Sequence, residues 1–244
     1  MKITYFGHSC FSVLAGGKQL LFDPFISENE LAKAIDIEEI DADYIFVSHG
    51  HFDHILDVLT IAGRTHAKVV ASWELCNYFS EHGLTNLQPL NPGGKVGFDF
   101  GVVKAVIAQH SSSFAGGEYA GVVSGFAVKT ADGSFYYSGD TALTVDMTLI
   151  PKWVDLDFAV FPIGDVLTMG MEDAIIAAGL VSTKKVMGVH YDTFEPIKIN
   201  RSNALREFEK AGLQLYLPAI GTTIDIDKNN EPPGQAILAS SSQL

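Results

Sequence analysis

The sequence predicts an α/β protein built from two β-sheets that pack face to face, with helices on the outer face of each sheet. The first observation behind this prediction is that strands dominate two stretches, residues 1–25 and residues 95–138. The second is that each stretch is followed by units in which a buried strand precedes a helix. The third is that 47% of the 244 residues are apolar, which suffices for a large core. A single doubly wound sheet is the competing architecture.

The N-terminal half opens with three short strands joined by tight turns, one of them at Gly16-Gly17. Further along, short apolar runs predict buried strands, and apolar residues at helical spacing predict helices between them. The elements expected in this half are strands at residues 3–6, 10–14, 19–23, 43–47 and 67–71, and helices at residues 55–62 and 73–81.

The C-terminal half continues the alternation after the strand-rich middle, where an Ala131-Asp132-Gly133 turn joins two strands. The elements expected here are strands at residues 102–108, 125–130, 134–137, 158–163, 185–189, around Leu215 and at 223–226, and helices beginning at Val145 and at residues 171–181 and 201–211. Helices are therefore spread among the strands over the whole chain, as the two-sheet architecture requires.

No linker divides the chain, so we expect residues 1–228 to form a single domain. Residues 229–244 contain Pro232-Pro233-Gly234 and Ser240-Ser241-Ser242. This composition predicts a C-terminal loop followed by a frayed tail.

A surplus of acidic residues limits the expected partners. The chain has 16 Lys and Arg against 29 Asp and Glu, a formal net charge of −13, and no basic cluster offsets it locally. Because such a surface repels phosphate backbones, nucleic acid is not an expected partner. No apolar run approaches the roughly 18 residues of a membrane span, and the N-terminus lacks a signal-peptide pattern, so no membrane association is expected. Cys10 and Cys76 match buried thiols of a reducing compartment, which predicts a cytoplasmic location.

Directly after the strand at residues 43–47, three imidazoles and a carboxylate lie close together as His49, His51, Asp53 and His54. In an extended segment, residues two apart project to the same side, so His49, His51 and Asp53 can converge. His54, on the opening turn of a helix, faces a neighbouring position, and Gly50 lets the backbone turn without obstruction. Neutral imidazoles and carboxylates are ligands of divalent first-row metals. One segment can therefore serve two metal ions.

The alternative interpretation of this cluster is a solvated His-rich loop. The cluster follows a buried strand, however, and α/β folds place their sites at such strand ends. Three further residues with ligand chemistry, His110, Asp140 and His190, also end apolar strands. Each alone is more often structural, but together with the cluster they predict a complete metal site. Because a carboxylate has two oxygens, Asp140 can bridge two cations.

These residues resemble a known family, the metallo-β-lactamase superfamily, whose H-x-H-x-D-H motif is intact at residues 49–54. His110, Asp140 within Ser138-Gly139-Asp140-Thr141, and His190 follow in the order of that superfamily's remaining ligands. The resemblance runs from Met1 to about Ile226 and implies the four-layer αββα sandwich of the metallo-β-lactamase fold.

Three shorter segments point to one branch of this superfamily. Residues 1–9, 21–25 and 168–174 are similar to a branch of metal-dependent hydrolases related to ascorbate-6-phosphate lactonase. One departure is Asp165, which follows Pro162-Ile163-Gly164 where this branch has a second glycine. The departure bears on the shape of the nearby pocket.

The resemblance also implies roles for the candidate ligands. The implied set is His49, His51 and His110 on a first metal, Asp53, His54 and His190 on a second metal, and Asp140 bridging the two. Asp53 and Asp140 are the residues expected to take part in catalysis. Zinc or manganese is expected at both positions, and iron is compatible with the same ligands.

Other polar residues have weaker assignments. His8 follows a strand, and by resemblance it lines the site or donates a hydrogen bond behind a ligand, although an ordinary turn histidine is equally compatible. Asp23 precedes Pro24 and is expected to orient a metal-binding histidine or to cap the turn. Tyr191 can offer its hydroxyl to a substrate, with a core tyrosine as the alternative. His66 and His82 are expected at the surface.

The sequence therefore predicts a dinuclear hydrolase in which a metal-bridging hydroxide attacks a small-molecule lactone, ester or phosphoester. The enzymatic alternative is a phosphodiesterase or nuclease, which the lack of basic patches disfavours. The alternative from another class is a non-hydrolytic iron-binding redox or sensor protein, because a fold does not determine a reaction. A small-molecule substrate is the expected partner, and a homo-oligomer remains open.

Overall fold

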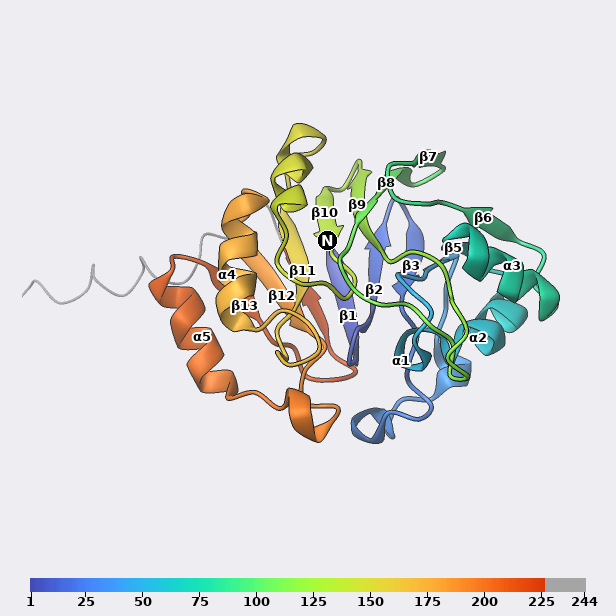
Figure 1. Cartoon of the computed structure of the whole chain (residues 1–244), viewed down its shortest axis with the longest axis horizontal. Helices are drawn as coiled ribbons and strands as arrows, with labels where there is room; N and C mark the ends of the chain where they lie inside the picture. The colour runs from blue at the N-terminus through green and yellow to red at the C-terminus, as the bar shows by residue number, and fades with distance from the viewer. Residues whose placement is uncertain (227–244) are drawn as a thin grey trace, which may run out of the picture.

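The structure is a computed structural model that describes residues 1–226, so the tail expected at residues 229–244 lies outside the described residues. Two seven-stranded sheets form its centre. Figure 1 shows α4 and α5 on one flank of the molecule and α2 and α3 on the other. The predicted two-sheet sandwich with outer helices is confirmed, and the single doubly wound sheet is wrong.

The first sheet has the strand order β14-β1-β2-β3-β4-β5-β6. Strands β1, β2 and β3 pair antiparallel through tight turns, whereas β3 to β6 run parallel. The strands are β1 (Lys2–Gly7), β2 (Cys10–Ala15), β3 (Lys18–Phe22), β4 (Tyr44–Phe46), β5 (Lys68–Ala71), β6 (Leu87–Pro89) and β14 (Thr223–Asp225).

The second sheet has the order β13-β12-β11-β10-β9-β8-β7 and repeats this organisation. Strands β7 to β10 pair antiparallel, and β10 to β13 run parallel. The strands are β7 (Lys95–Phe98), β8 (Gly101–Ile107), β9 (Ser124–Thr130), β10 (Ser134–Tyr137), β11 (Phe158–Pro162), β12 (Lys185–Val189) and β13 (Gln214–Tyr216).

Helices follow the parallel strands and cover the sheets. The α-helices are α1 (Phe52–Ile55), α2 (Val58–Thr65), α3 (Trp73–Glu81), α4 (Met171–Leu180) and α5 (Arg201–Lys210), and the 3-10 helices are η1 (Glu30–Ala32), η2 (Ile37–Glu39), η3 (Val145–Lys152) and η4 (Glu195–Ile197). Side-chain caps define the starts of two of the α-helices, because Ser72 accepts a hydrogen bond from Leu75 N and Asn200 accepts one from Asn203 N.

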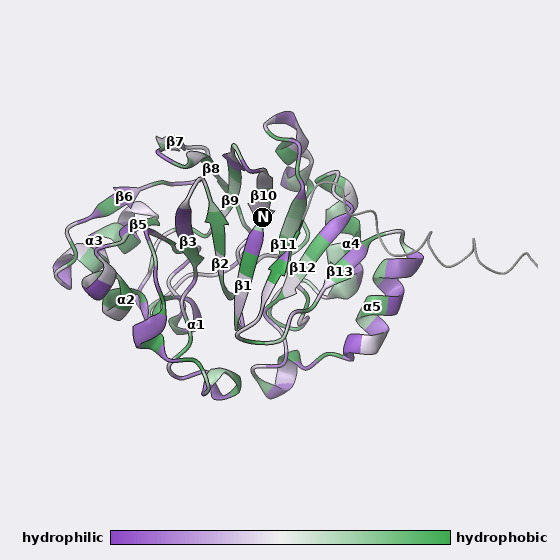
Figure 2. Ribbon diagram, turned by 180° about the vertical axis from the view of Figure 1, so that it is seen from behind, coloured by the Kyte–Doolittle hydropathy of each residue, from purple (hydrophilic) through white to green (hydrophobic). Residues whose placement is uncertain are grey.

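The central strands are apolar on both faces, because three apolar layers separate the four layers of structure. In β11, Phe158 and Val160 lie in the core between the sheets, whereas Ala159 and Phe161 pack toward α4 and α5. A third apolar cluster fills the space between the first sheet and α2 and α3. Figure 2 shows the contrast between the apolar β2 and the largely polar α5. This double burial explains why the strands are continuous apolar runs in the sequence.

Two expected helices differ from the structure, and one strand was missed. The helix expected at residues 55–62 is two helices, α1 and α2, because Asp57 stands at the break and accepts hydrogen bonds from Ile26 N and Ser27 N. The helix beginning at Val145 is the 3-10 helix η3, which contains Pro151. Strand β6 was not expected, since it is three residues long and ends in a proline at the edge of its sheet.

Among residues 1–226, no helix combines the length and the apolar character needed to cross a membrane.

Candidate metal centre

The topology brings the candidate ligands to one edge of the sandwich. In the first sheet, β1, β3 and β4 run in the same direction, and in the second sheet β8, β10 and β12 do so too. Their carboxyl ends carry the candidate residues: His8 after β1, Asp23 after β3, His49 to His54 after β4, His110 after β8, Asp140 after β10 and His190 after β12. Hydrogen bonds across the edge, such as His190 N to His8 O (2.9 Å), join the two sheets there.

A first group of ligand atoms comes from His49, His51 and His110 and fits within 4.8 Å. His49 Nε2 and His51 Nδ1 are 2.9 Å apart, and the His110 ring lies 5.2 Å, centroid to centroid, from each of the other two rings. Two nitrogens on one tetrahedral zinc, with bonds of about 2.0 Å, stand about 3.3 Å apart. The three imidazoles are therefore arranged to hold one ion.

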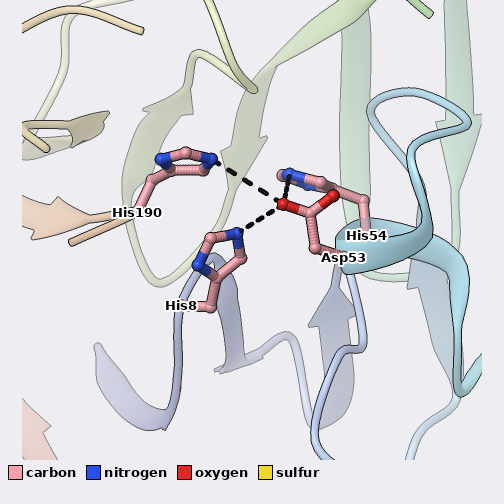
Figure 3. A group of neighbouring side chains, drawn as sticks. All are labelled: His8, Asp53, His54 and His190. Carbon is pink, nitrogen blue, oxygen red and sulfur yellow. Dashed lines mark hydrogen bonds and ion pairs between the residues drawn. The ribbon is translucent and has the colours of Figure 1, made fainter. Parts of the chain in front are cut away.

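A second group comes from His8, Asp53, His54 and His190 and also fits within 4.8 Å. Figure 3 shows these four side chains pointing toward one another. Asp53 Oδ2 is 3.0 Å from His8 Nε2 and 3.9 Å from both His54 Nε2 and His190 Nε2. Three elements far apart in the sequence thus contribute to one cluster.

Asp140 lies between the two groups. Its Oδ2 atom is 3.0 Å from His190 Nε2 and 3.2 Å from His54 Nε2, both of the second group. The same oxygen is 3.8 Å from His110 Nε2 of the first group. One carboxylate therefore reaches both groups, which is the position that a bridging ligand needs.

Asp23 is fully buried and supports the ligands from behind. Its Oδ2 atom accepts hydrogen bonds from His54 Nδ1 (2.8 Å), Ser48 Oγ (2.5 Å) and Tyr137 OH (2.5 Å), and Oδ1 accepts from Ser48 N (2.7 Å). Because a carboxylate only accepts, the proton of His54 lies on Nδ1 and Nε2 faces the centre. Such carboxylates orient metal-binding imidazoles in known metal sites.

Ser48 extends this support to the first group. Its hydroxyl donates to Asp23, so its oxygen accepts from His49 Nδ1, 2.9 Å away. The lone pair of His49 then lies on Nε2, toward His51. One buried carboxylate therefore sets the tautomers of one imidazole in each group.

The electrostatics of the centre favour a cation. Burial by itself lowers the pKa of His54, but the carboxylates of Asp140, Asp23 and Asp53 together raise that pKa well above its ordinary value. Burial opposes ionisation of Asp140, yet His190 and His54 hold the pKa of its carboxyl well below the usual range. Burial lowers the pKa of His49 and keeps its imidazole neutral. The ionised carboxylates thus favour positive charge at the centre, and His49 lies beside them as a neutral donor, the combination that binds a metal ion.

Three buried atoms of the candidate ligands have no hydrogen-bond partner among the described residues. One is His190 Nδ1, in a ring whose Nε2 faces Asp140, and the other two are His54 Nε2 and Asp140 Oδ1 at the centre. The nearest carboxylate oxygen to His54 Nε2 is Asp140 Oδ2, which lies 3.2 Å away in an ion-pair contact. An unpaired buried polar atom costs about 1–3 kcal/mol. A divalent cation held by the two atoms at the centre would remove that cost, so the residues present fit a metal.

Backbone strain accompanies the centre. His8, Asp23 and His190 have left-handed φ values of 53°, 40° and 54°. Such conformations cost about 1–3 kcal/mol for residues other than glycine and persist where the surrounding structure enforces them. Hydrogen bonds to His8 O from Tyr5 OH and His190 N supply part of that enforcement.

A cavity of about 600 Å³ opens above the centre. Its residues include members of both groups, together with apolar side chains and two serines. The lining comprises His51, Phe52, Asp53, His110, Ser111, Ser113, Phe114, Ala115, Asp140, Leu167, His190 and Phe194. Among these lining residues there is no Lys or Arg. The cavity therefore offers a small molecule apolar walls and a polar floor.

The remaining sequence candidates divide clearly. His8 lies in the second group, whereas His66 and His82 are exposed at the ends of α2 and α3. Tyr191 differs from the expected substrate contact, because its side chain is 2% exposed and packs in the core beside α4 and α5. Its ring stacks on Tyr5, 6.3 Å away, and does not line the cavity.

Several residues of the centre carried no signal in the sequence. Ser48, Tyr137 and Thr193 hold Asp23 or His8, but serine, tyrosine and threonine are common at strand ends. Phe114 and Phe194 line the cavity from loops whose position depends on the whole fold. The ligand residues were recognisable from residue type and spacing, and Asp23 and His8 were the supporting residues expected beside them.

Comparison with known proteins adds three findings. Residues 18–191 match the family model of the beta-lactamase superfamily domain. A protein of Flavobacterium johnsoniae named UPF0173 metal-dependent hydrolase is 46% identical over 226 residues, which cover 93% of this chain and 100% of that protein. Igni18, described as a novel metallo hydrolase from Ignicoccus hospitalis, superposes with a TM-score of 0.82 and 31% identity, covering 91% of this chain and 97% of that one.

A more distant likeness concerns the fold alone. CmlA, described as a diiron beta-hydroxylase from Streptomyces venezuelae, superposes with a TM-score of 0.70 at 15% identity. The match covers 91% of this chain and 53% of that chain.

Proposed function

The chain belongs to the beta-lactamase superfamily and, within it, to the UPF0173 metal-dependent hydrolases, and on that premise we propose that it is a dinuclear hydrolase of small neutral esters or lactones. The observation that carries the proposal is the place of Asp140 Oδ2, within 3.8 Å of imidazole nitrogens from both groups. A carboxylate so placed matches a bridge between two cations. A single ion would leave one group of buried imidazoles without a role.

In this proposal, His49, His51 and His110 would hold the first ion, Asp53, His54 and His190 would hold the second, and Asp140 would contribute to both. Zinc or manganese suits these imidazole and carboxylate donors. Two such ions supply a Lewis acid for the reacting carbonyl and lower the pKa of bound water to about 7.

The residues of the chain orient and insulate this chemistry. Asp23 and Ser48 hold the rings of His54 and His49, so the donor atoms are in place before substrate binds. Phe52, Phe114 and Phe194 line the cavity above the centre with apolar rings, and a substrate bound among them would displace water. A drier cavity strengthens every charge interaction within it.

The walls of the cavity favour neutral substrates. Phosphate sites in proteins are rich in Arg, Lys or helix N-termini, and no Lys or Arg stands among the lining residues. A phosphoester would rely on the metal ions alone for charge balance. An ester or lactone with hydrocarbon substituents matches both the apolar walls and the polar floor.

The experiment is a metal-reconstitution screen. Protein stripped with a chelator is loaded with Zn²⁺ or Mn²⁺ and assayed on p-nitrophenyl butyrate, γ-butyrolactone homologues, p-nitrophenyl phosphate and bis-p-nitrophenyl phosphate. The proposal predicts metal-dependent turnover of the esters or lactones at least 100-fold above the metal-free protein, and little turnover of the phosphates. Preferential phosphate hydrolysis would contradict the substrate class.

An oxygen electrode in the same assay separates the redox alternative. Iron-loaded protein that consumes dioxygen and hydrolyses none of the esters would support a non-hydrolytic iron protein and would overturn the proposal. The fold likeness to a diiron beta-hydroxylase makes this control worthwhile.

A further inference from the structure

The loop between β11 and α4, residues 164–170, holds an unusual backbone conformation beside the centre. Asp165 and Val166 have consecutive left-handed φ values of 62° and 59°. For a β-branched residue such as valine this conformation is a genuine outlier, and it costs about 1–3 kcal/mol. A conformation of this cost needs support from the surrounding structure.

Both ends of the 164–170 loop are attached to the ligand segments. Gly164 and Gly170 form an antiparallel bridge that closes the loop. A Cβ atom on Gly164 would collide with the carbonyl oxygen of His190, so the loop begins in direct contact with a candidate ligand. At the other end, Met169 N donates to the carbonyl of Thr141, the neighbour of Asp140, over 3.0 Å.

Asp165 builds the tip of the loop. Its Oδ1 atom accepts a hydrogen bond from Val166 N at 2.7 Å, and its backbone N donates to Met169 O at 3.2 Å. A glycine at this position would lack the side-chain acceptor. Asp165 therefore stabilises a specific shape of the loop.

The tip presents two apolar side chains to solvent, Val166 at 68% exposed and Leu167 at 55% exposed. Only Leu167 lines the cavity, together with Phe52, Phe114 and Phe194. Covering an apolar side chain stabilises a complex by about 25 cal/mol for each Å² removed from water. Leu167 is therefore an exposed apolar side chain at the entrance to the centre that a bound molecule could cover. Val166 is its neighbour in the chain but does not line the cavity.

We infer that Leu167 is a specificity-determining residue that binds the hydrocarbon part of the substrate while the reacting group lies at the centre. The inference rests on the proposed ester or lactone hydrolysis and deepens it, because it predicts a preference for longer acyl chains. The strained loop holds Leu167 over the cavity, where it faces the aromatic walls.

The test compares Leu167→Ala with Val166→Ala, two truncations of adjacent exposed apolar residues of which only one lines the cavity. KM is measured for p-nitrophenyl acetate, butyrate, hexanoate and octanoate on the metal-loaded proteins. In parallel, calorimetry gives Kd for acetohydroxamate, hexanohydroxamate and octanohydroxamate, whose head groups chelate metal and whose tails differ in length.

For the wild type and Val166→Ala, we expect KM and Kd to fall about two- to fourfold for each added methylene until the cavity is filled. For Leu167→Ala, we expect KM and Kd of the hexanoyl and octanoyl compounds to rise about tenfold, with the acetyl compounds changed less than twofold. If KM and Kd depend on acyl-chain length equally in the two variants, the inference is overturned. It is also overturned if KM and Kd of the wild type do not depend on chain length.

The two hypotheses fail in different ways. If no ester is hydrolysed but the hydroxamate series loses its chain-length dependence in Leu167→Ala, the proposed function is wrong and the apolar contact stands. If esters are hydrolysed with the same dependence in both variants, the function stands and the role of Leu167 is wrong.

Discussion

Nε2 of His8 donates a 3.0 Å hydrogen bond to Oδ2 of Asp53, which ties the end of β1 to the ligand segment after β4. Burial lowers the pKa of His8 to about 4, so the ring is neutral at pH 7 and carries one proton. Since a carboxylate only accepts, that proton lies on Nε2, and Nδ1 accepts from the Thr193 hydroxyl at 3.0 Å. Both ring nitrogens of His8 thus have hydrogen-bond partners, so His8 orients Asp53 and is not itself a metal ligand.

From this relationship, we predict that His8→Ala weakens binding of the second metal about 10- to 100-fold, because Asp53 loses the contact that orients it. His8→Gln, whose amide can donate to Asp53, should recover part of the affinity. Calorimetric titration of the metal-free protein with Zn²⁺ or Co²⁺ measures the affinity for each ion. Thr193→Ser serves as the matched control, since it keeps the hydroxyl. Unchanged affinity of His8→Ala for both metals would remove His8 from the centre.

Asp140→Asn is predicted to reduce the bound metal from two ions per chain to one or fewer. The amide keeps the size of the side chain but removes the charge that a bridge between two cations requires. Elemental analysis after gel filtration gives the stoichiometry, and turnover should fall at least 100-fold. Asp155→Asn, at an exposed position away from the centre, is the control and should retain both ions. Two ions retained in Asp140→Asn would argue against the bridge.

Asp23→Asn tests the support behind the ligands. The amide cannot accept all the hydrogen bonds that Asp23 receives from His54, Ser48 and Tyr137, so His54 loses its fixed tautomer. We expect metal affinity to fall about 10- to 100-fold. Tyr137→Phe removes one donor and leaves the carboxylate, and its effect should be smaller. If both substitutions lower metal affinity equally, the carboxylate charge of Asp23 does not determine that affinity.

Two glycine-to-alanine substitutions test two different effects on stability. One is the close packing of Gly164 against the His190 carbonyl, and the other is the low helix propensity of Gly179. Gly164→Ala should destabilise the protein by more than 1 kcal/mol, because the added Cβ meets the carbonyl of His190. Gly179→Ala, within α4 and with open space around the added Cβ, should instead stabilise it by about 0.5–1 kcal/mol. Urea denaturation measures both free energies of unfolding. A stabilising Gly164→Ala would contradict the tight contact beside His190.

The sequence predicted the sandwich and the ligand residues because both depend on local patterns. Doubly buried strands such as β11 and β12 are continuous apolar runs, and the residues that follow β4, β8, β10 and β12 have ligand chemistry. Strands β8, β10 and β12 run in one direction in the second sheet, and β4 runs with β1 and β3 in the first, so these ends meet at one edge.

The remaining features depend on tertiary contacts that no spacing reveals. The break between α1 and α2 follows from Asp57, whose carboxylate binds backbone groups of Ile26 and Ser27. The burial of Tyr191 follows from packing against Tyr5 and the helix-covered core. The cavity walls come from loops after β4, β8, β11 and β12, and their shape is set only when both sheets are assembled.

The central claim is that two metal ions share Asp140, and anomalous diffraction from Zn²⁺-loaded crystals tests it most directly. The account predicts two anomalous peaks about 3.5–4 Å apart, one beside His49, His51 and His110 and one beside Asp53, His54 and His190, with Asp140 between them. A single peak at full zinc loading, or two peaks with Asp140 bound to neither, would contradict the account.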